Sequence, residues 1–404
     1  MPNGIFSLNE VYAEQTSDSW STASDVWLLG SPVTVGESPF GYYGGGRQTP
    51  SPSTLSSIER IDYGNDTTTA LVRGPLDRRR FYTAAIGSRS HAYVVAGNTS
   101  GADADSESTV SRIDYANDTN VTAPKGPLTK IGWQQGTAGN NDYGYIGGGG
   151  TYPGGSRSTV DRIDYTNDTA TALAKGPLSG TNIGLTGVAN PSYGYFAGGG
   201  PGPVSTVDRL DFASDSTACA TKGPLSVARS NLAGAGNANY GYVGGGWSPA
   251  KSIVDRIDYS SDTPTTVAKG PLDNARYDLA ATGSSSHGYW AGGGGSVSNI
   301  ERLNYTNDTI ECISRGPLSV GRDRFGGASA ADYGLTLGLK GAASNTGLDG
   351  VPVGTDYGYF GGGNYPSPTN YSTVDRVDYS NDTPTMVAKG PLAASTCYFG
   401  ATGN

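Results

Sequence analysis

Residues Ser158–Ser179 read Ser-Thr-Val-Asp-Arg-Ile-Asp-Tyr-Thr-Asn-Asp-Thr-Ala-Thr-Ala-Leu-Ala-Lys-Gly-Pro-Leu-Ser, and the chain carries seven copies of this stretch with small changes. The Gly-Pro-Leu end of the stretch begins at Gly74, Gly126, Gly176, Gly223, Gly270, Gly316 and Gly390. Successive copies are 52, 50, 47, 47, 46 and 74 residues apart. A period of about fifty residues predicts a repeat architecture, either a solenoid or a propeller.

Each repeat contains four segments with the pattern of a short β-strand. A Tyr-Gly-Tyr-type segment such as Tyr193–Phe196 leads into a run of glycines. After a loop of variable length comes the segment Val160–Tyr165, in which successive side chains point to opposite faces. Thr-Asn-Asp-Thr then predicts a tight turn, because Asn and Asp bond to their own backbone. A third segment, Ala170–Ala174, ends in Gly-Pro, and a fourth, such as Leu279–Thr282, precedes the next Tyr-Gly-Tyr.

Four short strands per unit, with glycines ending one of them, are typical of a β-propeller blade. From Phe40 to Asn404 the chain resembles kelch repeats: the glycine cluster matches the family's diglycine, Tyr165 its tyrosine, and Gly-Pro-Leu its closing turn. The family's tryptophan is missing, and residues such as Leu173 or Val267 take its place. The resemblance implies an all-β fold, a seven-bladed kelch-like β-propeller of four-stranded antiparallel blades over residues 40–404.

The ends of the repeat region predict how the ring closes. The repeats begin at Phe40 in the middle of a blade, and the chain ends with the strand that elsewhere precedes Tyr-Gly-Tyr. We therefore expect Thr396–Gly403 to lie beside Tyr42–Gly45 in the first blade. Such a pairing leaves no open sheet edge in that blade.

The sixth interval exceeds every other one by more than twenty residues. Tyr333–Leu339 keeps the spacing of a blade strand, whereas residues 340–356 lack the other parts of the repeat. We interpret this segment as an extra hairpin inserted between blades six and seven. A truncated eighth blade is the alternative.

Composition and charge limit the class of partner. The formal net charge is −9, and the chain has no cluster of Lys and Arg, which argues against a nucleic-acid partner. No stretch approaches the roughly twenty apolar residues of a membrane span, and residues 1–30 lack the pattern of a secretory signal. We expect a soluble protein on a virion or an extracellular surface, with the cytoplasm as the alternative. Cys219 and Cys312 occupy equivalent places in different repeats, so we expect all three cysteines to be free.

Charged residues recur at fixed places in the repeat. Arg162 with Asp164 is matched by Arg256 with Asp258 in another copy. Because a buried arginine is tolerated only when it is paired, we expect these pairs to stabilise the packing of blades rather than to act as acid and base.

Other signals for chemistry are weak. The Asn-Asp-Thr turns offer oxygen ligands and form glycosylation sequons, but their spacing matches no calcium loop, and turn formation explains them. His91 and His287 are too few for a zinc or copper site. We expect no catalytic residue, no metal and no cofactor. A carboxylate pair that cleaves glycans is the enzymatic alternative.

The remaining candidate is a surface. In kelch proteins the loop after the glycine cluster and the segment after Gly-Pro-Leu emerge on the same face, and loops that vary on a constant frame carry specificity. The candidate binding residues on this face are Arg80, Tyr82, Trp133, Tyr152, Arg229, Trp247, Arg276, Tyr277, Arg322 and Tyr365. An ordinary surface without a ligand is the competing interpretation.

Residues 1–39 lack the repeat yet contain Trp20 and Trp27. Since tryptophan is enriched at interface hot spots, we expect a docking arm that joins a larger protein assembly, with a partly disordered leader as the alternative. The combination of a leader without a secretory signal, acidic repeats rich in Gly, Tyr and Asn, and no catalytic motif resembles virion or appendage proteins of tailed bacteriophages, such as tail or capsid-decoration proteins. The leader's Ile5-Phe-Ser-Leu-Asn-Glu resembles the start of phage tail proteins. That resemblance implies a non-enzymatic binding or structural module whose loops meet a host-surface glycan or protein. A bacterial glycan-binding or glycan-processing propeller is the alternative.

Overall fold

The computed structural model describes residues 40–45, 47–48, 53–62, 71–88, 90–99, 106–151, 155–283, 286–294, 297–318, 321, 326–329, 334–336, 343–345, 357–363, 371–378, 382, 386–393, 395 and 400–403. The chain divides into two units, Met1–Glu37 and Ser38–Asn404. The predicted docking arm with Trp20 and Trp27 lies outside the described residues. In the part of the chain that is described, no helix has the length and apolar character needed to cross a membrane.

Seven four-stranded antiparallel sheets form the second unit. From the innermost to the outermost strand, the first three are β34 (Gly400–Gly403), β1 (Phe40–Gly44), β4 (Ile58–Asp62), β5 (Leu71–Arg73); β6 (Ala84–Gly87), β7 (His91–Asn98), β8 (Ser106–Asp114), β9 (Ala123–Lys125); and β10 (Gly136–Gly139), β11 (Tyr143–Gly147), β14 (Val160–Asp164), β15 (Leu173–Lys175).

The fourth to seventh sheets are β16 (Thr186–Ala189), β17 (Tyr193–Ala197), β18 (Val207–Asp211), β19 (Ala220–Thr221); β20 (Ala233–Gly236), β21 (Tyr240–Gly244), β22 (Val254–Asp258), β23 (Val267–Lys269); β24 (Ala280–Gly283), β25 (His287–Ala291), β26 (Ile300–Asn304), β27 (Ile313–Arg315); and β28 (Gly326–Ser329), β31 (Tyr357–Gly361), β32 (Val374–Asp378), β33 (Val387–Ala388). Three two-stranded ladders pair β2 (Arg47–Gln48) with β3 (Ser53–Thr54), β12 (Gly150–Thr151) with β13 (Gly155–Ser156), and β29 (Gly334–Thr336) with β30 (Ala343–Asn345). Two 3₁₀ turns, η3 (Phe212–Ser214) and η4 (Tyr305–Asn307), lie in the fourth and sixth sheets' outer connections.

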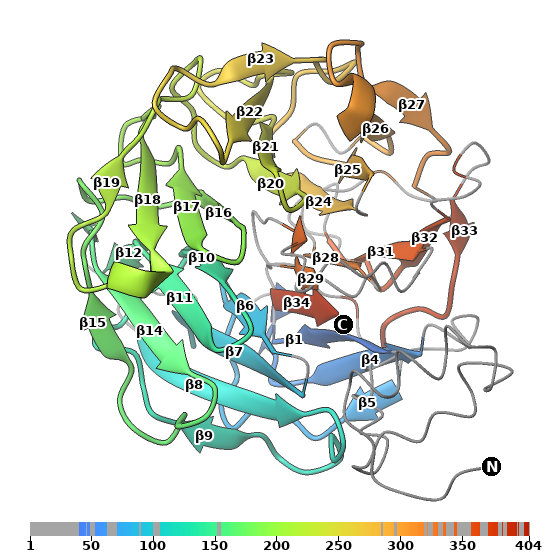
Figure 1. Ribbon diagram of the computed structural model, residues 1–404. Coiled ribbons are helices and arrows are strands. Elements are labelled where there is room, and N and C mark those ends of the chain that lie inside the picture. Colours follow the sequence, from blue (N-terminus) through green and yellow to red (C-terminus); the bar gives the residue numbers. More distant parts are fainter. Residues whose placement is uncertain are drawn as a thin grey trace, which may run out of the picture. The chain divides into compact units, whose positions relative to one another are not determined.

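The sheets are the blades of a closed ring. Each innermost strand contacts the innermost strand of the next blade, from β34 and β6 round to β28 and β34. Figure 1 shows the blades arranged in this order about a common centre. The predicted seven-bladed kelch-like β-propeller is confirmed.

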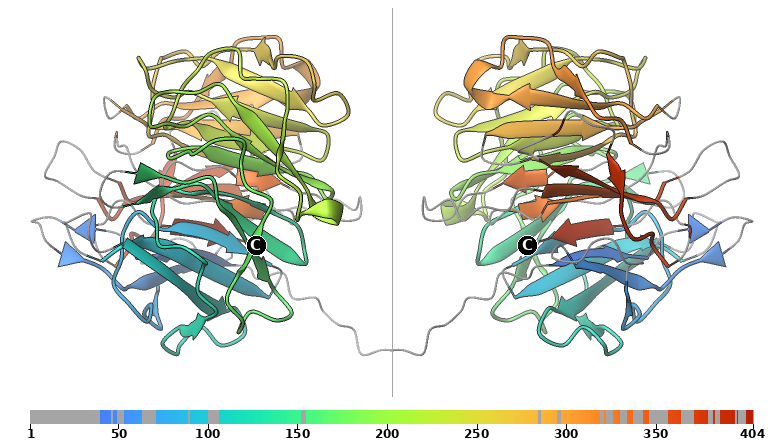
Figure 2. Two further views of the ribbon diagram at one scale, coloured as in Figure 1. Left: turned by 90° about the vertical axis from the view of Figure 1, so that its left-hand side faces the viewer. Right: turned by 90° about the vertical axis from the view of Figure 1, so that its right-hand side faces the viewer.

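The ring closes in the first blade, as the sequence predicts. β34 pairs antiparallel with β1, with Gly403 opposite Gly41 and Gly400 opposite Gly44. The red C-terminal strand lies among the blue N-terminal strands in both side views (Figure 2). One blade therefore contains both ends of the repeat region.

The two ends of the blades carry different connections. The segment that leaves the outermost strand and the loop after the glycine cluster lie side by side, since Ile183 bridges Gly200 and Ser230 bridges Trp247. We call this the loop face, and it confirms that both sets of loops share one face. The opposite face, which we call the turn face, carries the short connections from innermost to second strand, such as residues 190–192.

The long sixth interval is placed differently from the prediction. Blade seven takes β31, at Tyr357–Gly361, as its second strand, whereas residues 334–336 belong to the separate hairpin β29–β30. The insertion is thus a hairpin, as expected, but it lies inside blade seven and not between blades six and seven. The prediction that Tyr333–Leu339 is a blade strand is wrong, because residues 357–361 repeat the Tyr-Gly-Tyr pattern and pair with β28.

The Gly-Pro-Leu motif joins each blade to the next. The amide of Gly126 donates to the carbonyl of Asp168 at 2.9 Å, and the carbonyl of Pro127 accepts from Ala172 at 2.9 Å. A Cβ atom on Gly126 would lie 1.5 Å from the carbonyl oxygen of Ala170. Glycine is required here because the next blade's backbone occupies the space of a side chain.

We predict that a chain ending at Leu392 will not fold into a stable ring. Without β34, β1 loses its innermost partner and exposes an unpaired edge, which promotes aggregation. Size-exclusion chromatography and thermal unfolding check this, with a chain ending at Gly403 as the control. A soluble truncated chain with the full-length melting temperature would contradict the closure.

Candidate functional site

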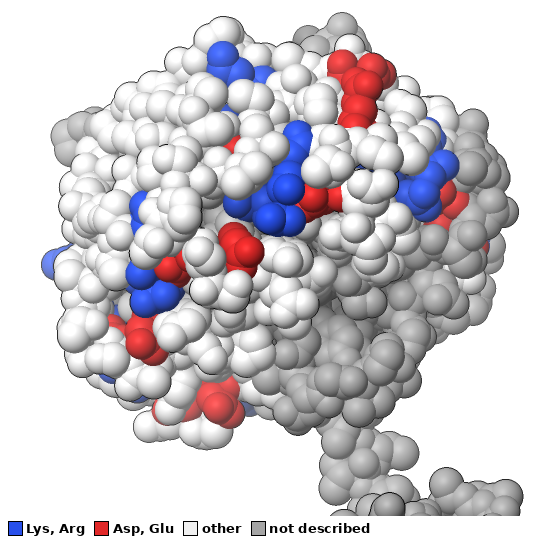
Figure 3. Space-filling model, turned by 45° about the horizontal axis from the view of Figure 1, so that its top comes forward, with Lys and Arg blue, Asp and Glu red and all other residues white. Residues whose placement is uncertain are grey.

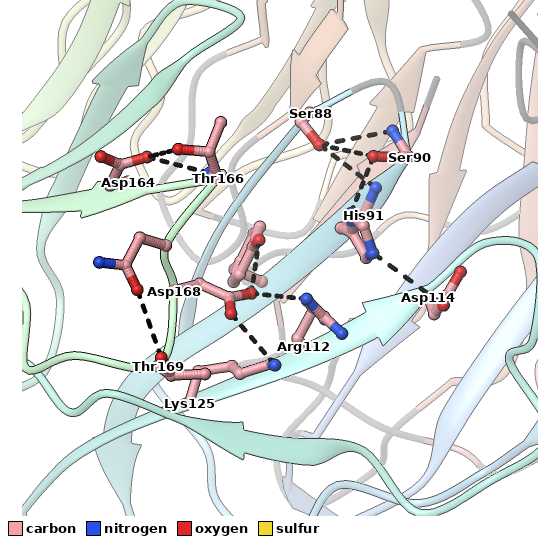
Figure 4. Close-up of polar contacts among 12 residues, drawn as sticks. Ser88, Ser90, His91, Arg112, Asp114, Lys125, Asp164, Thr166, Asp168 and Thr169 are labelled. Atoms are coloured by element: carbon pink, nitrogen blue, oxygen red, sulfur yellow. Dashed lines mark hydrogen bonds and ion pairs between the residues drawn. The ribbon is translucent and has the colours of Figure 1, made fainter.

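The recurring charges form one unit at the junctions between blades that the structure describes, shown for blades two and three in Figure 4. The carboxylate of Asp168 accepts a hydrogen bond from the Tyr93 hydroxyl at 2.9 Å and pairs with Arg112 at 2.9 Å and Lys125 at 3.1 Å. The ring of Tyr93 stacks on Tyr165, with centroids 5.2 Å apart. One carboxylate from the turn of blade three thereby binds three strands of blade two. We call this arrangement the interblade unit.

The same unit occurs at all six junctions that the described residues cover. In each, one aspartate accepts from a tyrosine of the preceding blade's second strand. It also pairs with one cation from the third strand and one at the end of the fourth strand or directly after it. The aspartates are Asp118, Asp168, Asp215, Asp262, Asp308 and Asp382. By its position in the repeat, the seventh would be Asp66, which lies outside the described residues.

The arginine of the repeat therefore pairs with a different aspartate from the one predicted. Arg162 bonds to Asp215 of the next blade at 2.7 Å. Asp164 instead accepts from the backbone amide of Thr166 at 2.9 Å and holds the turn. The role in blade packing is confirmed, but the partner assignment was wrong because sequence spacing shows only neighbours within a strand. Asn304 accepts from Thr306 in the same way, which is why asparagine replaces aspartate there.

Burial and bonding shift the pKa values within these units. Burial raises the pKa of Tyr93, and the bond to Asp168 raises it further. Burial works against ionisation of Asp168 as well, but the bonds from Lys125 and Tyr93 and the charge of Arg112 lower its pKa below the ordinary value. Asp215 and Asp308 behave alike. Each of these carboxylates is thus an anion already saturated by its partners, which suits a structural role and not proton transfer.

Three of the predicted arginines, Arg80, Arg229 and Arg276, are buried, so the prediction that they line an accessible face is wrong. Arg229 pairs with Asp255 at 2.7 Å and Arg276 with Glu301 at 3.1 Å, and all four side chains are fully shielded from solvent. Arg80 is equally buried. The third strand of the same blade supplies the carboxylate to Arg229 and Arg276, whereas Arg80 donates to the Ser111 hydroxyl of that strand. Arg322 lies outside the described residues.

In blade three, an arginine from a different segment supplies the guanidinium at this position. Gly132 stands where blades two, five and six have arginine. A Cβ atom on Gly132 would lie 1.6 Å from the guanidinium of Arg157, which reaches in from the variable loop. The charge of Asp161 acts on this guanidinium, although burial is the larger effect and lowers the pKa of Arg157. This exchange supports a structural role for the position.

A different set of residues surrounds the ring's central channel at the loop face. Two residues before each innermost strand, the backbone is left-handed in blades two to six. The φ angles are 55° at Tyr82, 56° at Gln134, 67° at Gly184, 58° at Asn231 and 54° at Asp278. Each of the last four amides donates to the carbonyl of the equivalent residue in the preceding blade, at 3.5, 3.1, 2.9 and 3.1 Å. We call these five residues the crown. No sequence motif identifies the crown, since its five residue types differ.

Two aromatic pairs flank the crown. Tyr82 packs on Trp133, with ring centroids 5.4 Å apart, and Trp247 packs on Tyr277 at 4.5 Å. Trp247 is 45% exposed, whereas the other three rings are half-buried. Each pair joins neighbouring segments of the loop face, so the aromatic surfaces are held rigidly. Tyr152 and Tyr365, the remaining predicted residues of this face, lie outside the described residues.

The remaining reactive groups are tied to the frame. The Nδ1 atom of His91 contacts the Ser90 hydroxyl at 2.8 Å, and burial lowers its pKa. Cys219 and Cys312 are buried, free thiols that donate to backbone carbonyls, and burial raises the pKa of each to about 12. Cys397 lies outside the described residues. Among the residues that the structure describes, no three His, Cys, Asp or Glu side chains gather as a metal site would require.

Three equivalent clefts lie beside the turns of blades two, three and five, with volumes of about 160, 230 and 160 Å³. The middle one is lined by Gly126, Arg162 and Asn167 among others. Equivalent residues of the repeat line all three clefts, so the clefts offer no feature that would select a particular ligand. Figure 3 shows that the charged side chains on the face drawn lie in small groups of both signs.

Comparisons with known proteins define the fold and no more. No family model and no curated protein matches the sequence. A solved structure titled "Structure of YjhT", a kelch-like β-propeller protein, matches with a TM-score of 0.55 and 12% sequence identity, over 77% of this chain and 97% of that one. At this identity the likeness concerns the β-propeller alone.

We predict that Asp215→Ala lowers the free energy of unfolding by about 3 kcal/mol, because it leaves Arg162, Lys175 and the Tyr145 hydroxyl without their common acceptor. Arg162→Ala should cost only about 1 kcal/mol, since Asp215 keeps two partners. Urea denaturation measures both, with Asp164→Ala, which affects only a turn, as the control. If Asp215→Ala and Asp164→Ala lower the free energy of unfolding equally, the interblade unit adds nothing to stability.

We predict a stability maximum at mildly acidic pH. The lowered pKa values of Asp168, Asp215 and Asp308 add stability that is complete above about pH 4 and lost as the pH falls through their folded values. Burial raises the pKa of Asp161, so protonation of this group stabilises the folded state as the pH falls towards about 4.

Melting temperatures between about pH 3 and pH 8 check this prediction. Asp215→Asn should flatten the loss of stability below about pH 4, because its unit no longer gains a proton on unfolding. If the melting temperature of this variant falls as steeply below about pH 4 as that of the unchanged protein, other groups cause the loss of stability.

Proposed function

We propose that the protein is a non-enzymatic binding module that contacts its ligand with the loop face, around the crown and its two aromatic pairs. One observation carries the proposal. Aromatic surface remains accessible here, at Trp247, on a frame whose backbone is bonded from blade to blade. Left-handed non-glycine residues cost of order 1 kcal/mol each and tend to cluster at functional sites.

The chemistry of this surface favours a polar, ring-shaped ligand such as the sugar of a surface glycan. Tyrosine and tryptophan offer an apolar face together with a polar tip. The crown adds the half-buried amide side chains of Gln134 and Asn231, whereas Asp278 is buried. The carboxylates of the interblade units are saturated by cations, which is why we prefer binding over catalysis. A glycan-processing enzyme is the second candidate.

We also propose that residues 1–39 attach the module to a larger protein assembly such as a phage virion, on a tail or capsid, with the loop face directed at the host surface. This placement stays a prediction from the sequence, supported by Trp20 and Trp27 in a segment that the repeats do not need.

Binding to a glycan array tests the proposal. We predict that Trp247→Ala weakens binding to the recognised glycans about tenfold or more, since stacked aromatic rings each contribute about 1 kcal/mol or more. Val267→Ala, an exposed aliphatic residue of the outermost strand β23, is the matched control and should bind normally. A chain lacking residues 1–35 should also bind normally. Equal binding by the Trp247 and Val267 variants would contradict the proposed site.

A further inference from the structure

The hairpin β29–β30 starts from the turn face. Ser329 at the end of β28 pairs with Gly358 near the start of β31, whereas Gly326 at the beginning of β28 pairs with Gly361 before the glycine cluster. The connection between them therefore leaves the strands at the end opposite to the crown. In blades three, four and five the same connection is only three residues long, residues 140–142, 190–192 and 237–239.

The hairpin lies at the centre of the ring. β29 contacts the innermost strands β28, β34 and β6, and β30 contacts β16, β20, β24 and β28. Innermost strands of six different blades thus meet one hairpin, which only the channel permits. Figure 1 draws β29 beside β28 and β34 near the middle of the ring.

Burial of the innermost strands points the same way. Successive side chains of a strand face opposite sides, so a strand that lines an open channel exposes every second residue to water. In β6, β10, β16 and β20 all four residues are buried. These strands consist mostly of glycine, alanine and threonine, which leaves room for further backbone inside the ring.

We infer that the hairpin β29–β30 closes the channel from the turn face, so that the crown surrounds a blind cup and not a passage. The inference about the ligand rests on the proposed function. A blind cup accepts the terminal unit of a glycan and excludes a polymer threaded through the ring. The hairpin is then the segment that limits how deep a ligand enters.

Thiol labelling tests the closure without any ligand. Ser344→Cys in β30, in a chain that also carries Cys397→Ser, should react with a bulky maleimide at least tenfold more slowly than Ser214→Cys, an exposed residue of η3. Both should react at the same rate in urea. Native rates that differ less than tenfold would overturn the inference.

A second variant replaces residues 330–356 with Asn-Ala-Asn, the connection of residues 237–239. Because the innermost strands would then face water, we predict that their backbone amides in β6, β10, β16 and β20 exchange hydrogen about tenfold faster. A variant with a Gly/Ser segment of the original length should behave likewise, which separates the hairpin from chain length. Unchanged exchange in folded variants would show that the hairpin does not fill the channel.

A binding experiment compares one glycan unit at the end of a glycan chain with the same unit inside a polymer. Binding to the terminal form alone supports the blind cup, and equal binding to both contradicts it. Failure to bind any glycan contradicts the proposed function, while the labelling result still decides whether the channel is closed.

Discussion

The interblade unit is the constraint on which the propeller depends. A β-sheet of four strands cannot bury both faces alone, so each blade needs a neighbour at a defined distance and angle. Asp168 fixes this distance and angle for one pair of blades. Its carboxylate binds a tyrosine of the preceding blade's second strand, an arginine of its third and a lysine of its fourth. A partly buried anion with two cations and a hydroxyl is satisfied only in that arrangement. Repetition of the unit therefore sets the geometry of the ring.

Two further contacts act on the same turn. The glycine of Gly-Pro-Leu donates to the backbone of the aspartate, as Gly126 does to Asp168, and leaves no room for a side chain. The tyrosine ring stacks on the tyrosine that precedes the turn. Backbone, ring and charge contacts thus converge on the turn of each repeat and the residues that it binds. This is the physical reason why those residues vary least along the chain, while the loops between them vary freely.

Positions that vary are not all functional. The place after Gly-Pro-Leu holds Arg229 in one blade and Gly132 in another, yet both blades fill it with a guanidinium, in blade three that of Arg157. The crown shows the opposite case. Its residues differ in type while their backbone is the same, so the frame depends on their backbone and not on the identity of their side chains. Such positions are where a repeat protein can acquire specificity without disturbing its ring.

The sequence by itself determined the number of blades, the strand order within a blade and the closure by the C-terminal strand, because these follow from periodicity and local turn chemistry. It also placed the inserted hairpin within the correct interval. It did not determine that Arg162 binds Asp215, that Arg229 is buried, or that the hairpin lies in the channel. Those features join residues of different blades, and a one-dimensional spacing records only neighbours along the chain. Only the tertiary structure, which sets the distance between blades, decides them.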